Sequence, residues 1–215
     1  MRRTLSEHDS LALLHDHGIP VVAETVVATP AEAGRAATTL GFPVVVKAAG
    51  DRITHKTERG LVRLGLRSAP EVEAAAAQVL DATGPDDGAV ALVVAPMVHG
   101  ARELIAGLHR DDQFGPCVMV GIGGVLAEAL ADVAIRLAPI DRHDAHDMLD
   151  DLRGGALLGP FRGEPAVDRD QVAAVLLALS DLAAARPDLV AVDVNPLVIV
   201  AGAPVAVDAL VELDP

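Results

Sequence analysis

Several segments of the chain combine a helical spacing of apolar residues with helix start and stop signals. Ser6 precedes a helix predicted over residues 7–17, and Gly18 follows it. Thr29 and Pro30 begin a second helix, which ends at Leu40 before Gly41. Ser68 and Glu71 form the capping-box pattern of a third helix, expected to reach about Thr83. Two more helices are predicted over residues 141–152 and 168–185.

Between these helices lie short segments rich in Val, Ile, Leu and Ala, which predict strands. The expected strands are 21–28, 42–49, 61–66, 89–98, 101–110, 116–122, 189–194, 197–200 and 205–210. Residues 125–134 fit a strand or a short helix equally well. The Gly, Pro and Asp residues at 84–88 mark a boundary between two parts of the molecule. The fold class is therefore α+β, without an internal repeat.

Composition narrows the range of partners. Hydrophobic residues make up 51% of the 215 residues but aromatic residues only 1%, so the core is aliphatic and base-stacking platforms are not expected. The formal net charge of −14 argues against nucleic acid as a partner. Cys117 is the only cysteine, which excludes an internal disulfide. The single cysteine also fits a reducing, cytoplasmic setting. No apolar run approaches the roughly 18 residues of a membrane helix, so no membrane contact is expected.

Lysine usage draws attention to the strand 42–49 and the loop after it. Of the 17 basic residues, only Lys47 and Lys56 are lysine. Lys47 lies in the apolar sequence VVVKA, where an ammonium group must reach solvent or meet an anion. A lysine that extends outward from an edge strand is the simpler interpretation. A bound phosphate is the functional one.

The loop 51–60, DRITHKTERG, favours the functional interpretation. It combines Gly, hydroxyl, cationic and imidazole groups between two predicted strands, and such a loop can cover phosphates. His55 is the sharpest candidate within it, because a neutral imidazole can accept a phosphoryl group. Most loop histidines are merely solvated, so the interpretation of His55 depends on its phosphate-binding neighbours.

Three oxygen-bearing side chains near the C-terminus suggest a cation site. Asp193 and Asn195 are two residues apart and share one face of a strand, and Asp208 belongs to the neighbouring predicted strand. Asp193 stands in the otherwise apolar LVAVDVNPLVIV, so we expect it to be buried and to need a cation. An amide oxygen and a carboxylate make a partial shell for Mg²⁺, completed by nucleotide phosphates and water. The alternative is an Asn-Pro turn with surface aspartates.

Four blocks, taken in order, resemble a known family. GFPVVVKA, HKTERGLVRLGL, PMVHGARELIAGLHRDDQFGPCVMVGIGG and VDVNPLV look like the ATP-grasp part of ADP-forming acyl-CoA synthetases, over nearly all of residues 5–212. The resemblance implies an ATP-grasp fold in which two α+β lobes clasp ATP. The whole chain, 1–215, is then one module, with lobes of approximately 21–88 and of 1–20 with 89–215.

The resemblance also implies roles for particular residues. Lys47 matches the lysine that contacts the nucleotide phosphates, and Glu103 matches an acidic residue of the nucleotide site. Asn195 and Asp208 match magnesium ligands. The segment that matches the adenine-contacting hinge consists of Ala95, Pro96, Met97 and Val98.

Two catalytic residues follow from the same resemblance. His55 matches the family's second phosphohistidine, and Asp193 matches the acidic residue expected near the phosphorylated histidine. The implied relay passes phosphate from a histidine on a partner to His55 and then to ADP, with Mg²⁺. The CoA-binding alpha subunit or domain that carries the first phosphohistidine does not fit into 215 residues, so a hetero-oligomer is expected.

Two other functions remain open at this point. A nucleotide-sensing module that regulates a protein acetyltransferase would bind ATP without passing phosphate on. An ATP-dependent carboxylate-amine ligase would share the fold, but it would pass phosphate directly to a carboxylate and gives no reason for a histidine in the HKTERG loop.

Overall fold

The computed structural model describes residues 2–214 except 51–52, 54–58, 125–130 and 162. It divides into two compact units, Val22–Met97 and Met1–Val21 with Val98–Pro215. The sequence suggested that residues 89–97 belong to the larger lobe. The structure places them in the smaller unit, because β5 (Ala91–Pro96) pairs along its whole length with β3 (Val44–Ala49).

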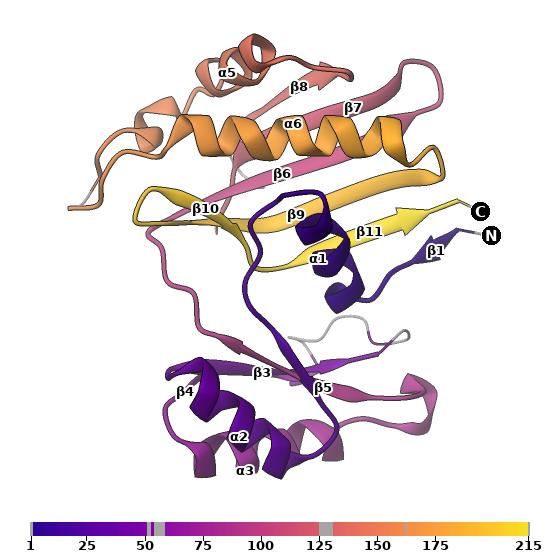
Figure 1. Cartoon of the computed structure of the whole chain (residues 1–215), viewed down its shortest axis with the longest axis vertical. Helices are drawn as coiled ribbons and strands as arrows, with labels where there is room; N and C mark the ends of the chain where they lie inside the picture. Colours follow the sequence, from indigo (N-terminus) through magenta and orange to yellow (C-terminus); the bar gives the residue numbers. More distant parts are fainter. Residues whose placement is uncertain (1, 51–52, 54–58, 125–130, 162, 215) are drawn as a thin grey trace. The chain divides into compact units, whose positions relative to one another are not determined.

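The smaller unit is an antiparallel sheet with two helices on one face (Figure 1). Its strand order is β2-β5-β3-β4, with β2 at Thr25–Val27 and β4 at Val62–Leu66. The helices are α2 (Pro30–Leu40) and α3 (Ala69–Asp81), followed by the 3₁₀ turn η1 (Pro85–Asp87). Val44, Val46 and Ala48 alternate along β3 and pack beneath the helices, where they are fully buried.

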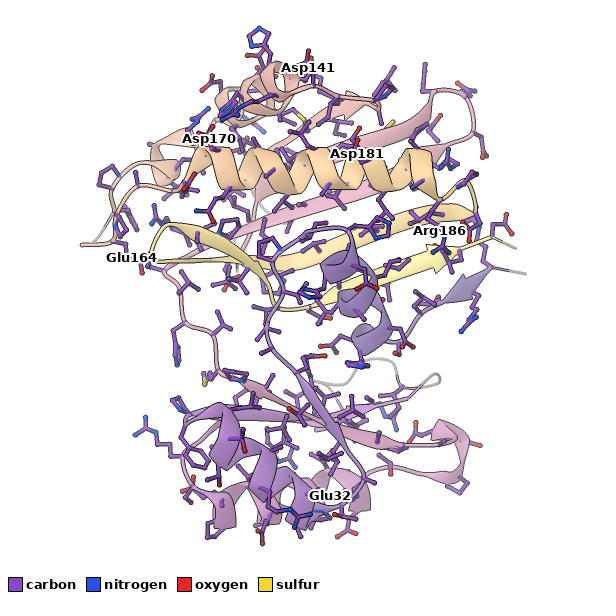
Figure 2. All side chains as sticks on the ribbon, viewed as in Figure 1. Glu32, Asp141, Glu164, Asp170, Asp181 and Arg186 are labelled. Carbon is purple, nitrogen blue, oxygen red and sulfur yellow. The ribbon has the colours of Figure 1, made fainter. Side chains whose placement is uncertain are left out.

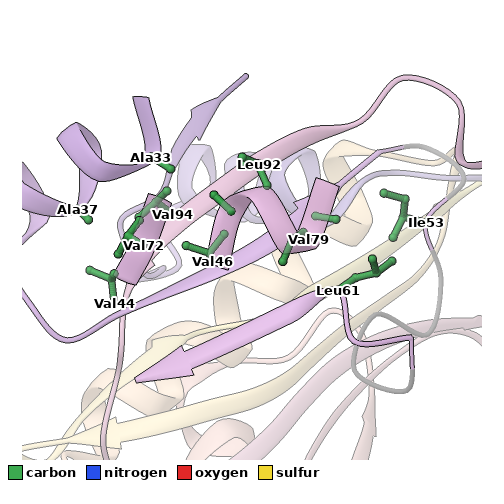
Figure 3. Packing of buried hydrophobic residues seen from close by; sticks show 12 residues of the cluster. Ala33, Ala37, Val44, Val46, Ile53, Leu61, Val72, Val79, Leu92 and Val94 are labelled. Atoms are coloured by element: carbon green, nitrogen blue, oxygen red, sulfur yellow. The ribbon is translucent and has the colours of Figure 1, made fainter. Parts of the chain in front are cut away.

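The buried residues that the structure describes in the core of this unit are aliphatic (Figure 3). Ala33 and Ala37 on α2 are fully buried in this core. Leu61, next to β4, and Ile53 close the end of the core nearest the loop 51–60. In sequence, the buried residues Ile53 and Leu61 thus flank residues 54–60, which include His55.

The larger unit is built on a seven-stranded antiparallel sheet of order β1-β11-β9-β6-β7-β8, in which β10 also pairs with β9. The strands are β1 (Arg3–Thr4), β6 (Arg102–Asp111), β7 (Gly115–Ile122), β8 (Val133–Leu137), β9 (Leu189–Val200), β10 (Ala203–Ala206) and β11 (Ala209–Leu213). Its helices are α1 (Glu7–Asp16), α5 (Arg142–Asp150) and α6 (Arg169–Ala185), with the 3₁₀ turn η2 at Gly155–Leu158. In Figure 1, α6 lies across β6 and β7, and α1 lies beside β11.

All five predicted helices are present, and their caps explain their starts. Thr29 accepts the backbone N–H of Glu32, whose carboxylate accepts the N–H of Thr29 at 3.0 Å in return. Asp141 begins α5 with the same reciprocal arrangement. At α3 the cap differs from the predicted box, because the Glu71 carboxylate accepts the N–H of Arg67 instead of that of Ser68.

The strands differ from the prediction in their lengths and divisions, and the predicted strand 205–210 divides into β10 and β11, with Asp208 between the two and not within a strand. The segments 189–194 and 197–200 form one strand, β9, whereas the predicted strand 21–28 shortens to β2. Of residues 125–134, the part 125–130 lies outside the described residues, and β8 begins at Val133. In the part of the chain that the structure describes, we find no helix with both the length and the apolar character needed to cross a bilayer.

Candidate functional site

A change of pairing partner in β9 brings Asn195 and Asp208 together. Residues up to Val194 pair with β11, and residues from Leu197 onward pair with β10. At the change, the N–H of Asn195 donates to the carbonyl of Asp208 at 3.2 Å, and the N–H of Val207 donates to the carbonyl of Pro196 at 3.1 Å. Both predicted magnesium ligands are solvent-exposed, so their side-chain oxygens are accessible to a cation.

Asp193 is exposed, and the prediction that it is buried is wrong. Strand alternation explains the result, because Val192 and Val194 occupy the buried face of β9 and leave Asp193 on the opposite face. Desolvation by the surrounding protein nevertheless raises the pKa of the Asp193 carboxyl. The group is therefore a more ready proton acceptor than an ordinary surface aspartate.

Glu103 lies on the same face of the larger sheet as Asp193. Gly107 pairs with Asp193 across the ladder, and Glu103 is four residues before Gly107 on β6, so alternation places both acids on one side. The backbone carbonyl of Glu103 accepts the N–H of Gly123 at 2.8 Å. Gly124 adopts a positive φ of 84°, and the turn that it forms lies against the Glu103 carboxylate.

A cavity of about 320 Å³ lies beside this turn, within the larger unit. Arg102 and Glu103 line it together with Gly123 and Gly124, and aliphatic side chains of the η2 segment form another wall. In the described residues, the backbone hydrogen bond from Gly123 fixes this segment to β6, and Gly124 forms a bend.

Two ionic side chains hold the glycine-rich segment 153–165 against the sheet, and sequence reasoning identified neither. Arg102, 5% exposed, donates to the carbonyls of Leu157 at 3.2 Å and Gly159 at 2.8 Å. It also pairs with Glu164, labelled in Figure 2, at 3.4 Å. Asp132 accepts the N–H groups of Arg153 at 3.0 Å and Gly154 at 2.7 Å. These partners are 21 to 62 residues apart in sequence, so no local pattern could reveal them.

In the smaller unit, Lys47 is held by a carboxylate that the sequence did not suggest. Its Nζ lies 2.9 Å from Oε1 of Glu24, and the two side chains are 10% and 4% exposed. The lysine therefore does not extend outward from an edge: β3 is flanked by β5 and β4, and Lys47 pairs with Val93 and Val62. The sequence left two alternatives for the Lys47 ammonium group, solvent or an anion. The described structure supplies an anion from within the chain.

The predicted hinge, Ala95 to Val98, spans the boundary between the two units, which lies between Met97 and Val98. Ala95 is buried in β5, Pro96 ends that strand, and the N–H of Met97 donates to the carbonyl of Pro43 at 2.9 Å. The backbone is thus fixed up to Met97 by pairing within the smaller unit. Val98 is the first residue of the second segment of the larger unit.

His55, the predicted phosphohistidine, and Lys56 lie outside the described residues. The described ends of their loop are both anchored. Ile53 is buried in the core, and Arg59 makes a two-pronged ion pair with Asp87 at 2.8 and 2.7 Å. The Arg59 guanidinium and the N–H of Gly84 lower the pKa of Asp87 to about 2.

The oxygen-bearing side chains at the point where β9 changes its pairing partner suit a hard cation. Asn195 offers an amide oxygen and Asp208 a carboxylate, which are ligands that Mg²⁺ accepts, and both side chains are exposed. Within the described part of the chain, no group of three or more His, Cys, Asp or Glu side chains could hold a metal ion. A cation bound by Asn195 and Asp208 would therefore take its remaining ligands from a substrate and from water.

A family model for the ATP-grasp domain matches residues 1–213. The chain belongs to the ATP-grasp family. The ATP-grasp relatives include the beta subunit of acetate–CoA ligase [ADP-forming] I of Pyrococcus furiosus, 32% identical over 210 residues, which are 96% of this chain and 90% of that one. Acetate–CoA ligase [ADP-forming] I of Archaeoglobus fulgidus is 35% identical over 88% of this chain, but the match covers only 28% of that longer protein.

Solved ATP-grasp structures agree with the fold. An acetyl-coenzyme A synthetase 1 of Ca. Korarchaeum cryptofilum, in complex with coenzyme A and Ca-AMPCP, superposes with a TM-score of 0.91 at 31% identity, covering 98% of this chain and 93% of that one. These findings confirm the predicted ATP-grasp fold and the resemblance to ADP-forming acyl-CoA synthetases.

Proposed function

We propose that this chain is the nucleotide-binding beta component of an ADP-forming acyl-CoA synthetase and that it moves phosphate between ATP and a histidine. The observation that carries the proposal is a cluster on one face of the larger sheet. A backbone hydrogen bond joins Asn195 to Asp208 where β9 changes its pairing partner, and Asp193 is two residues away from Asn195. The similarity to a beta subunit over nearly the whole length of both chains supports the same assignment.

Each residue has a defined task in this proposal. Lys47 binds the nucleotide phosphates, the hinge Ala95–Val98 contacts adenine, and Glu103 contributes to the nucleotide site. Asn195 and Asp208 would hold Mg²⁺, which when bound neutralises charge on the phosphates.

The phosphoryl step needs only positioning and charge neutralisation. A phosphoryl group arrives at His55 from a phosphohistidine of a CoA-binding alpha partner. The P–N bond to His55 then breaks as a terminal oxygen of ADP forms the new P–O bond, which leaves neutral His55 and ATP. Asp193, with its raised pKa, accepts a hydrogen bond from the imidazole and orients the ring.

Labelling by γ-labelled ATP and Mg²⁺ tests this function directly. Wild-type protein should acquire an acid-labile, base-stable label, and His55→Ala should not. His143→Ala is the matched control, because its side chain is 84% exposed on α5 and takes no part in the proposed site. Label of equal amount in His55→Ala would refute the assignment. ATP binding without label, both alone and with a CoA-binding alpha subunit added, would refute phosphotransfer.

The cation assignment has its own test. Asn195→Ala should raise the Mg²⁺ concentration needed for labelling, whereas Asn195→Asp, which keeps an oxygen at the same position, should stay closer to wild type. A magnesium titration that Asn195→Ala leaves unchanged would remove Asn195 from the site. The alternative of an acetyltransferase-linked nucleotide sensor finds no support in these relatives.

A further inference from the structure

Glu24 reaches Lys47 across an intervening strand. Thr25 pairs with Val94, so Glu24 stands one residue beyond that pair, level with Ala95 on β5. Ala95 in turn pairs with Val45 on β3, two residues from Lys47 on the same face. The small Ala95 side chain leaves room for the longer Glu24 and Lys47 side chains to meet, at 2.9 Å.

The contact between Lys47 and Glu24 is buried. Only 10% of the Lys47 side chain and 4% of the Glu24 side chain are exposed, so solvent screens the pair weakly. A buried ammonium without a partner is strongly unfavourable, and the carboxylate removes that penalty when no ligand is present. The lysine assigned to phosphate is therefore already neutralised by the protein.

We infer that Glu24 is a resident counterion that competes with nucleotide phosphate for Lys47 and so sets the affinity of the site. The inference rests on the proposed function, because it takes Lys47 as the phosphate contact. A phosphate that approaches Lys47 also approaches the Glu24 carboxylate, and the like charges repel. Binding must therefore overcome the ion pair, and removing the carboxylate charge should tighten it.

Glu24→Gln is the variant that tests this competition, because it keeps the shape of the side chain and removes its charge. Titration calorimetry with ATP and Mg²⁺ should show binding tighter than wild type by on the order of tenfold. Glu73→Gln is the matched control, since it changes the net charge equally at an exposed position on α3 of the same unit, and it should bind ATP as the wild type does. Adenosine, which lacks phosphates, should bind Glu24→Gln and wild type equally.

The outcomes separate the counterion from the proposed function. Equal ATP affinity in Glu24→Gln and wild type would overturn the counterion role and leave the function standing. Weaker ATP binding in Glu24→Gln would also overturn it, and would show that the carboxylate orients Lys47 toward phosphate. If Glu24→Gln bound adenosine more tightly by the same factor as ATP, the substitution would have changed the shape of the smaller unit and not relieved repulsion of the phosphates, which would overturn the counterion role. No ATP binding by any of these proteins would overturn both proposals.

The ion pair can also be measured without nucleotide. Lys47→Met leaves a buried carboxylate without its cation, so it should lower the urea midpoint of unfolding, and Glu24→Gln added to it should restore part of that loss. Strictly additive effects of the two substitutions would show that the groups do not interact, which would overturn the inference whatever the nucleotide titration gives.

Discussion

Leu61 offers a sharp test of how the smaller unit is held together. Its side chain is fully buried in the same core cluster as Val79 and Ile53, next to the described end of the loop that carries His55 (Figure 3). Its carbonyl also accepts the N–H of Ala48 at 2.9 Å. Leu61→Ala deletes buried methyl groups and leaves a cavity, which costs roughly 2–5 kcal/mol in such cores. That is a large share of the roughly 5–15 kcal/mol that stabilises a typical domain.

Leu64→Ala is the matched control for Leu61→Ala. Leu61 comes just before β4 and Leu64 lies within it, but the Leu64 side chain is 64% exposed. Truncating an exposed leucine should change the free energy of unfolding by no more than about 0.5 kcal/mol. The two variants remove the same atoms from the same part of the unit, so their difference isolates burial.

The assay is urea unfolding followed by far-ultraviolet circular dichroism, since the chain has no Trp or Tyr for fluorescence. With a slope of about 1–3 kcal/mol per molar urea, Leu61→Ala should lower the midpoint by about 1 M or more. If the units unfold separately, only the transition of the smaller unit should move. Equal midpoints for Leu61→Ala and Leu64→Ala would refute the assigned core.

Three further predictions concern single sites. The pKa of Asp193 is raised in the folded protein, so its contribution to stability is present at low pH and lost as the pH rises through the folded pKa. Asparagine carries no charge at either pH, so the melting temperature of Asp193→Asn should exceed that of wild type by more at pH 8 than at pH 4. Asp87 has a lowered pKa of about 2, so its pairing with Arg59 should weaken between about pH 4 and 2, and circular dichroism should show a shallower acid transition in Asp87→Asn. A Cβ at Gly107 would lie 2.7 Å from the carbonyl oxygen of Val192, so Gly107→Ala should lower the melting temperature, and an unchanged value would contradict the close approach of β6 to β9.

Local signals in the sequence predicted the helices well. The Thr29-Pro30 start and the Gly41 end of α2 depend only on neighbouring residues, and the structure reproduces both. The pattern at residues 189–200 was harder to interpret, because Asn195-Pro196 is typical of a turn. In the structure the pairing partner of β9 changes at this point, so the strand continues through a proline that cannot donate a hydrogen bond.

Burial and long-range partners could not be predicted in the same way. Asp193 stands among apolar residues in sequence, but its exposure depends on which face of β9 the helices cover. The carboxylate that meets Lys47 belongs to Glu24, just before β2, a strand that is not adjacent to β3, and the contacts of Arg102 reach the loop after η2. Such contacts follow from tertiary packing and have no local sequence pattern. The assigned roles of the site residues remain predictions.

The alternation along β9 also restricts how this sequence can change. Val192 and Val194 face the core while Asp193 and Asn195 face outward, so one strand supplies both the packing and the candidate chemistry. A single residue inserted before Val192, in a strand that stays regular, would reverse the two faces, burying the acid and the amide and exposing the valines. Insertions that surface loops tolerate are therefore excluded here, and in descendants of this protein the spacing of β9 should vary less than the side chains on either face.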